Sequence, residues 1–167
     1  VHYNSDRTGV RLIGPKPKWA RPDGGEAGLH PSNIHDNAYS VGAVDFTGDM
    51  PVILGPDGPS LGGFVCPVTV VAADLWKIGQ LKPGDSLQFS LISHKQATEL
   101  HEEQEERINR LKMPEEGSES IPLISSSAES CILAKGKSQL EEWVIRQSGD
   151  RNLLVEFGEP ILDLGLR

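Results

Sequence analysis

The densest group of polar side chains lies within residues 21–36. This stretch holds His30, Asn33, His35 and Asp36 among several glycines, with few apolar residues. Imidazole exchanges protons near neutral pH, and carboxylate and amide groups bind N–H donors, so these four side chains are candidates for acid–base or substrate-orienting chemistry. A loop this polar is either disordered or ordered by a ligand. The same residues equally suit a loop in which they cap turns.

A second candidate is the glycine-rich stretch 55–64, which contains Asp57, Ser60, Gly62 and Gly63. A glycine pair between strands lets backbone N–H groups approach a ligand oxygen closely, as a carbonyl or oxyanion site requires. Ordinary turn glycines are the alternative. The stretch matches neither GxGxxG nor the P-loop pattern, so nucleotide binding is not indicated. Gly58–Gly62 does read GxSxG, but Ser60 has no histidine near it in the sequence, so serine-hydrolase chemistry is not indicated either.

The overall charge restricts the partners of the protein. The 167 residues include 24 Asp and Glu against 16 Lys and Arg, a net charge of −8. Binding to nucleic acid phosphates needs clustered basic residues, so no nucleic acid partner is expected. No apolar stretch reaches the length of a membrane span, and no signal peptide opens the sequence, so no membrane partner is expected either.

The cysteines and histidines predict neither a disulfide nor a metal site. Cys66 and Cys131 are far apart and form no CxxC pair, and the five histidines include no HExxH. Two buried thiols in the reducing environment of a cytoplasmic protein, with no bound metal, is the simplest interpretation.

The elements that position these residues are expected to be short strands. Residues 1–92 carry most of the 18 glycines and 12 prolines, which is typical of many turns between strands. The alternation of Leu87, Phe89 and Leu91 with polar residues predicts a half-buried strand over 86–92. A short helix is expected over 72–77. Other strands are expected at 10–13, 43–46, 51–54 and 64–71, with a turn at 47–49.

The spacing of the apolar residues changes after residue 92, from the alternation of a strand to the spacing of a helix. Ser93 followed by Gln96 is a capping-box pattern, and it predicts a helix over 96–112. A narrow apolar stripe is expected on this helix, formed by Ala97, Leu100, Ile108 and Leu111. Residues 99–119 hold eight Glu against three basic residues, a local net charge of −5, which favours a solvated surface.

The end of the sequence predicts a second unit. Residues 113–140 are interpreted as a linker, because their first part is rich in Ser, Pro and Gly. Residues 143–147 and 152–157 alternate around a turn at 148–151 and predict a hairpin, the beginning of a second domain at 141. The sequence starts on Val1 and ends on Arg167 without a turn signal, so we expect it to be a piece of a longer protein.

Four segments together resemble the carboxyltransferase domain of urea carboxylase, the carboxylase half of fungal urea amidolyase. They are Val1–Gly9, Asp23–Asn33, Phe46–Asp49 and Asp57–Phe64. The wider family includes KipA-like proteins, allophanate hydrolase subunit 2 and 5-oxoprolinase subunits, which share the turn at Leu81–Asp85.

The resemblance implies a mainly β fold of cyclophilin-like β-barrels. Residues 1–112 would be the C-terminal part of the KipA-like portion, a partial barrel with one long helix, and 141–167 the beginning of a second, KipI-like barrel. The biotin carboxylase domain, which binds ATP and Mg, and the biotin carrier domain of the same polypeptide lie outside this sequence. The piece alone is therefore expected to be inactive.

The resemblance also implies a reaction: transfer of CO2 from carboxybiotin to urea, giving allophanate. Urea is a poor nucleophile, so the site must hold it beside carboxybiotin and stabilise charge on the biotin ureido oxygen. Residues assigned to urea are His30, Asn33, His35 and Asp36. Residues assigned to biotin or to a carbonyl group are Asp57, Ser60, Gly62 and Gly63. The alternative function is that of a KipA-type regulatory protein or a 5-oxoprolinase subunit.

Overall fold

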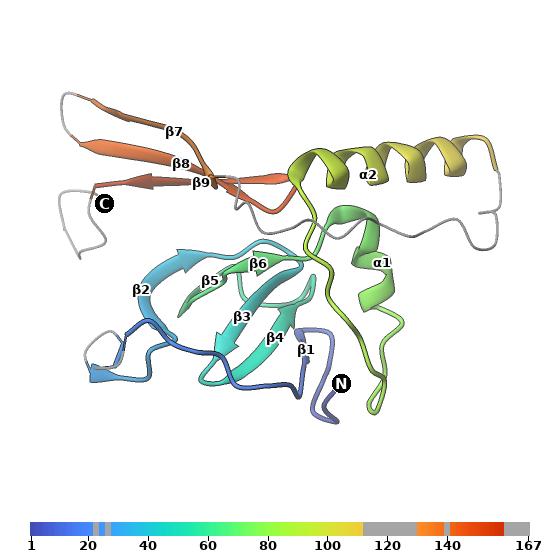
Figure 1. The fold of residues 1–167 in the computed structure, drawn as a ribbon, viewed down its shortest axis with the longest axis horizontal. Helices are drawn as coiled ribbons and strands as arrows, with labels where there is room; N and C mark the ends of the chain where they lie inside the picture. The colour runs from blue at the N-terminus through green and yellow to red at the C-terminus, as the bar shows by residue number, and fades with distance from the viewer. Residues whose placement is uncertain (22–23, 26–27, 112–129, 139–140, 159–167) are drawn as a thin grey trace.

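The protein is built from three antiparallel sheets and few helices (Figure 1). The computed structural model describes residues 1–21, 24–25, 28–111, 130–138 and 141–158. The prediction of a mainly β fold with one long helix is confirmed. In the described part of the chain, the strands form separate sheets of four, two and three strands that are not joined into a closed barrel.

The largest sheet has the strand order β1-β4-β3-β6. Its central hairpin joins β3 (Ala43–Thr47) to β4 (Met50–Leu54), as the sequence predicted, with Thr47 opposite Met50. Gly48 in the connecting turn has φ of 67°, a left-handed conformation that favours glycine. The outer strands are short: β1 is Gly9–Arg11 and β6 is Val68–Thr69.

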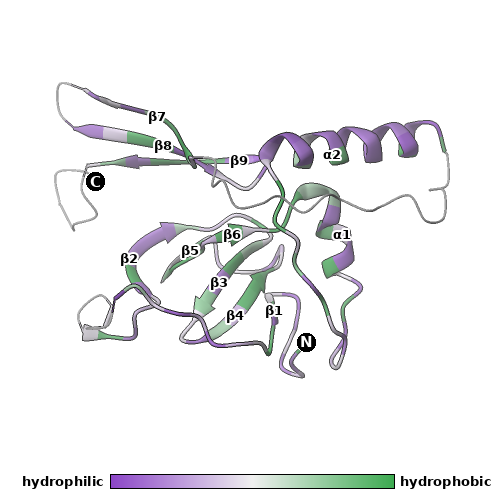
Figure 2. Cartoon of the chain, viewed as in Figure 1, coloured by the Kyte–Doolittle hydropathy of each residue, from purple (hydrophilic) through white to green (hydrophobic). Residues whose placement is uncertain are grey.

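The four-stranded sheet is apolar on both faces, which makes it the core of the molecule (Figure 2). Ile53 lies on one face with Val10, Leu12 and Val44, and the opposite face carries Ala43, Val52 and Leu54. The first face is covered by segments that include Val1 and Leu87, and the second by residues that include Tyr39 and Cys66.

A two-stranded ribbon covers part of the second face. It pairs β2 (Asn33–Ala38) with β5 (Leu61–Phe64) in antiparallel register, with a bulge or irregularity between Asn33 and Asn37. The polar stretch expected to be a loop is therefore in part a strand, because its backbone finds a partner in the glycine-rich stretch.

Two helical segments follow β6. A 3-10 turn η2 (Ala72–Asp74) continues into α1 (Leu75–Ile78), which confirms the predicted short helix. The long helix α2 runs over His94–Asn109, and its capping box is present: the Ser93 Oγ accepts from the Gln96 N–H and the Gln96 Oε1 accepts from the Ser93 N–H.

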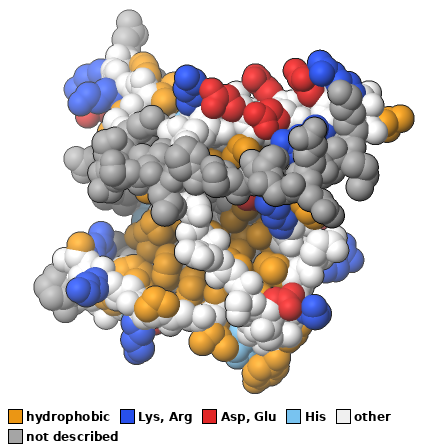
Figure 3. Space-filling model, turned by 45° about the vertical axis from the view of Figure 1, so that its right-hand side comes forward, with side chains coloured by type: hydrophobic (Ala, Val, Ile, Leu, Met, Phe, Trp, Pro, Cys, Tyr) orange, Lys and Arg blue, Asp and Glu red, His pale blue; other side chains and the backbone are white. Residues whose placement is uncertain are grey.

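The apolar stripe expected on α2 is mostly not buried. Ala97 is buried, but Ile108 is 59% exposed and Leu111, beyond the end of the helix, is 92% exposed. Contact between the helix and the body extends at least to Gln104, whose side chain donates to the Ala73 carbonyl. The rest of α2 is solvated and acidic (Figure 3).

The third sheet has the order β7-β8-β9. The hairpin of β8 (Glu142–Ser148) and β9 (Asn152–Phe157) was predicted, whereas β7 (Ile132–Lys137) lies within the expected linker. Residues 113–129 and 139–140 of that linker lie outside the described residues. The division into domains at 112 and 141 stays a prediction.

The strand predicted over 86–92 is wrong. Within the described residues, this segment pairs with no strand: Leu87 packs on the core, but Phe89 and Leu91 are more than half exposed. The strand predicted over 64–71 is split into the end of β5 and the short β6. Among the described helices, none is long and apolar enough to cross a bilayer.

Candidate functional site

The β2–β5 ribbon brings together six of the eight predicted site residues. Asn33, His35 and Asp36 lie on β2, and Gly62 and Gly63 lie opposite on β5. Ser60 immediately precedes β5, and its carbonyl accepts from the Tyr39 N–H at 2.8 Å. The two stretches that the sequence singled out are thus neighbours in space.

Three of these side chains have no protein partner. In the described part of the chain, Asn33, His35 and Asp36 make no side-chain hydrogen bond and no ion pair, and Asp36 is exposed. Amide, imidazole and carboxylate groups lie along one short strand and are free to bind a small polar molecule. This combination offers both donors and acceptors.

Packing requires a glycine at Gly62 and leaves little room for a side chain at Gly63, whatever the two residues bind. A Cβ on Gly62 would lie 2.7 Å from Cε2 and 2.8 Å from Oη of Tyr39, and a Cβ on Gly63 would lie 3.1 Å from the Ile34 and His35 carbonyl oxygens. The Tyr39 hydroxyl accepts from the Phe64 N–H at 2.7 Å and donates to the Phe64 carbonyl at 3.1 Å. Burial raises the pKa of Tyr39 to about 12, so this hydroxyl keeps its proton.

His30 is engaged by its own surroundings. Its Nδ1 lies 3.0 Å from the Ser32 Oγ, its Nε2 lies 3.4 Å from the Asp49 Oδ1, and Trp19 packs edge-on against the ring. Hydrogen bonds from Trp19 and Lys16 lower the pKa of Asp49, which therefore remains a carboxylate. His30 joins the turn before β2 to the β3–β4 turn, and its carbonyl accepts from the N–H of Asn33.

Asp57 is also paired with another residue. Its carboxylate lies 2.6 Å from the Arg7 guanidinium, and both side chains are well exposed. The structure therefore separates Asp57 and His30, each with a protein partner, from the side chains of Asn33, His35 and Asp36, which have none.

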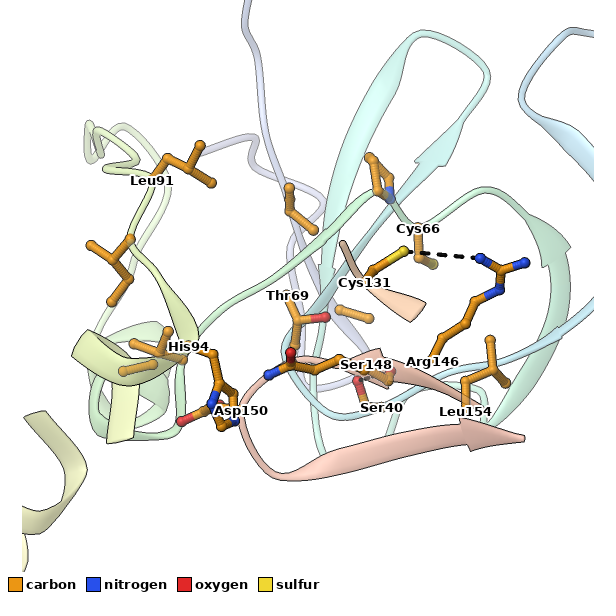
Figure 4. A pocket seen from close by; sticks show the side chains of 18 of the residues that line it. Ser40, Cys66, Thr69, Leu91, His94, Cys131, Arg146, Ser148, Asp150 and Leu154 are labelled. Atoms are coloured by element: carbon orange, nitrogen blue, oxygen red, sulfur yellow. Dashed lines mark hydrogen bonds between the residues drawn. The ribbon is translucent and has the colours of Figure 1, made fainter. Parts of the chain in front are cut away.

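A cleft of about 610 Å³ adjoins the ribbon, and sequence reasoning did not identify it. Asn37 and Ala38 at the end of β2 line it, as do Ser40 and Thr69 from the first part of the chain and residues of the third sheet (Figure 4). None of the eight predicted site residues lines this cleft. Its walls come from segments far apart in the sequence, so no local motif could reveal it.

Arg146 and both cysteines line the cleft. Arg146 on β8 pairs with Glu156, and its Nη1 lies 3.9 Å from the Cys131 Sγ. Burial, and to a smaller extent the Asp45 carboxylate, raise the pKa of the Cys66 thiol to about 12. Neither thiol is in a disulfide, but the prediction that both are buried is wrong, because Cys66 is only half-buried and Cys131 is exposed. Among the described residues, no three His, Cys, Asp or Glu side chains are grouped to hold a metal ion.

Comparisons with known proteins agree with this architecture. A urea amidolyase of Lachancea kluyveri is 56% identical over 99% of this chain, and one of Saccharomyces cerevisiae is 54% identical over the same share; the chain spans 9% of each. The crystal structure of the K. lactis urea amidolyase superposes with a TM-score of 0.79 at 55% identity, covering 99% of this chain and 10% of that one. The chain thus spans about a tenth of the length of these relatives.

The family model described as the carboxyltransferase domain, subdomain A and B, matches residues 1–91. This match confirms the resemblance seen in the sequence. Because these residues make up more than half of the chain, the chain belongs to the carboxyltransferase domain family.

Proposed function

We propose that this chain forms part of the carboxyltransferase of a biotin-dependent urea carboxylase, which transfers CO2 from carboxybiotin to urea and gives allophanate. The observation that carries this proposal is the 54–56% identity with urea amidolyases along 99% of the chain. The biotin carrier and biotin carboxylase domains belong to the rest of the polypeptide, and ATP and Mg bind in the latter. The reduced state of Cys66 and Cys131 suits the cytoplasm.

The urea side of the site is assigned to β2. Urea has four N–H donors and one carbonyl acceptor, so the Asp36 carboxylate accepts from its nitrogens and the Asn33 amide donates to its oxygen. His35 accepts the proton that the attacking nitrogen loses. His30 has a structural role, because its contacts with Ser32 and Asp49 hold the turn that precedes Asn33.

The biotin side is assigned to the other strand. The ureido group of biotin presents N–H donors and a carbonyl oxygen, and the exposed Ser60 hydroxyl and the backbone of Gly62 and Gly63 offer matching groups. Carboxybiotin, when bound, supplies the carboxyl group. Asp57, paired with Arg7, contributes to the loop before Ser60 rather than to the ribbon. No observation here favours a KipA-type regulatory protein or a 5-oxoprolinase subunit.

The test is alanine substitution of Asn33 and Asp36 in the full-length protein. Urea-dependent ATP hydrolysis should fall about 100-fold, the usual cost of losing a positioned polar group in an active site. Urea-independent carboxylation of biotin should be unchanged, because it takes place in another domain. Glu105→Ala, an exposed carboxylate on α2, is the control and should leave both rates unchanged. Normal urea-dependent turnover in N33A and D36A would remove these residues from the site.

A further inference from the structure

The turn between β8 and β9, residues 148–151, connects the third sheet to the rest of the protein; we call it the docking turn. Each of its four residues contacts a different segment. The Ser148 Oγ lies 3.4 Å from the Ser40 Oγ, and Gly149 packs against Thr69. Asp150 accepts a hydrogen bond from the start of η2, and an Arg151 Nη1 lies 3.3 Å from the Nε2 of a histidine on α2. Figure 4 shows Ser148 beside Ser40, with Asp150 farther along the turn.

Asp150 makes the most specific of these contacts. Its Oδ1 and Oδ2 lie 3.1 and 3.0 Å from the Ala72 nitrogen, whose N–H begins η2. Val71, at the capping position, offers no side-chain acceptor. A carboxylate 78 residues away thus supplies the group that a local cap would otherwise provide, and a charged acceptor makes a hydrogen bond about twice as strong as a neutral one.

The conformation of the docking turn allows this close approach. Gly149 has φ of 72°, and a Cβ there would lie 2.8 Å from the Thr69 Cγ2. The glycine therefore lets the turn lie directly against β6, with Asp150 in reach of Ala72. The neighbouring Arg151 contact extends the same interface to His101 on α2.

The docking turn also forms part of the lining of the cleft. Ser148 and Asp150 line it together with Arg146 of the third sheet, and Asn37 and Thr69 line it from the first part of the chain. Asn37 continues the strand on which the proposed urea residues lie. A shift of the turn would therefore move the third sheet relative to this strand, and a displacement of about 1 Å at a reacting site can cost about 100-fold in rate.

We propose that Asp150 is a positioning residue for CO2 transfer: through its bond to Ala72, it fixes the third sheet against the part of the chain that holds the urea site. This inference rests on the proposed function. Asp150 acts through the docking turn and its carboxylate is already occupied by the Ala72 N–H, so it is not assigned to substrate.

The test compares Asp150→Ala and Asp150→Asn in the full-length protein, with Glu142→Ala as the control. Glu142 pairs with Lys137 within the third sheet, so it matches Asp150 in charge and sheet. Two quantities are measured: hydrogen–deuterium exchange at Ala72 and in the docking turn, and kcat and KM for urea in urea-dependent ATP hydrolysis. In D150A, exchange at Ala72 should rise about 10-fold, and kcat should fall about 10- to 100-fold with little change in KM for urea. D150N keeps a neutral acceptor, so it should recover part of the exchange protection at Ala72 and part of kcat. Urea-independent carboxylation should stay normal in every variant.

Two outcomes would overturn the inference. Faster exchange at Ala72 with an unchanged kcat would make Asp150 a local cap only, and unchanged exchange would show that the bond does not hold the turn. Failure of the proposed function gives a different result: the unsubstituted protein would show no urea-dependent ATP hydrolysis, while the exchange measurement would still report on docking.

Discussion

Gly62 shows that a residue selected for its chemistry can be required by packing alone. We predict that Gly62→Ala destabilises the protein by about 1–3 kcal/mol, because the new Cβ would overlap the ring of Tyr39, which is held by two hydrogen bonds to Phe64. The free energy of unfolding of this chain in guanidinium chloride measures the effect. Gly79→Ala is the control, since the nearest atom to its Cβ is 3.6 Å away. A G62A chain as stable as the original would contradict this packing role.

The sequence could predict the chemical type of the site residues but not their partners. Asn33, His35 and Asp36 lie within four residues of one another, so any fold keeps their backbone positions close together. The engagement of His30 by Asp49, and of Asp57 by Arg7, depends on residues 19 and 50 positions away. No local pattern reports such contacts. Tyr39 was missed for the same reason, because its role exists only when β5 lies beside it.

At the scale of elements, the sequence was sufficient to predict those turns and helix ends that depend only on residues adjacent in the chain. The β3–β4 hairpin and the start of α2 depend on a turn glycine and a capping box, and both were predicted. The strand expected over 86–92 has the alternation of a strand but no neighbouring strand to pair with, and alternation alone cannot supply one. Strand β7 was missed because it lies within the segment that was interpreted as a linker, and its pairing with β8 cannot be recognised from its own residues.

The capping box gives a prediction at this scale. Ser93→Ala removes the acceptor of the Gln96 N–H and should lower the free energy of unfolding by about 1 kcal/mol. Ser93→Asp, which keeps an acceptor, should cost little. Thr98→Ala is the control within the same helix, because Thr98 only donates to the His94 carbonyl and is not a cap. Chemical denaturation followed by circular dichroism distinguishes these variants, and equal losses in S93A and T98A would exclude a capping contribution.

The cleft exists only at the scale of the whole molecule, since its two walls belong to parts that the sequence assigns to different units. Cys66 and Cys131 both line it. Cys131 is exposed, whereas Cys66 is half-buried. The two cysteines come from different parts of the chain. Their chemical reactivity therefore tests whether these two parts are arranged around the cleft as they are in the structure.

We predict that iodoacetamide modifies Cys131 at least about 100-fold faster than Cys66 at pH 8, because only the thiolate reacts and a thiol with a pKa of about 12 is ionised in about one molecule in 10,000 at that pH. Because the pKa of Cys66 is raised, its alkylation rate should increase about 10-fold for each pH unit up to that pKa. The ratio between the alkylation rates of Cys131 and Cys66 should therefore become smaller at alkaline pH. Mass spectrometry of the two tryptic peptides measures both rates, with Cys66→Ser and Cys131→Ser as assignment controls.

Asp150→Ala should increase the alkylation rate of Cys66 and leave that of Cys131 unchanged, because loss of the docking turn admits water to the half-buried Cys66 thiol. Equal rates in the unsubstituted protein would contradict the burial of the Cys66 thiol.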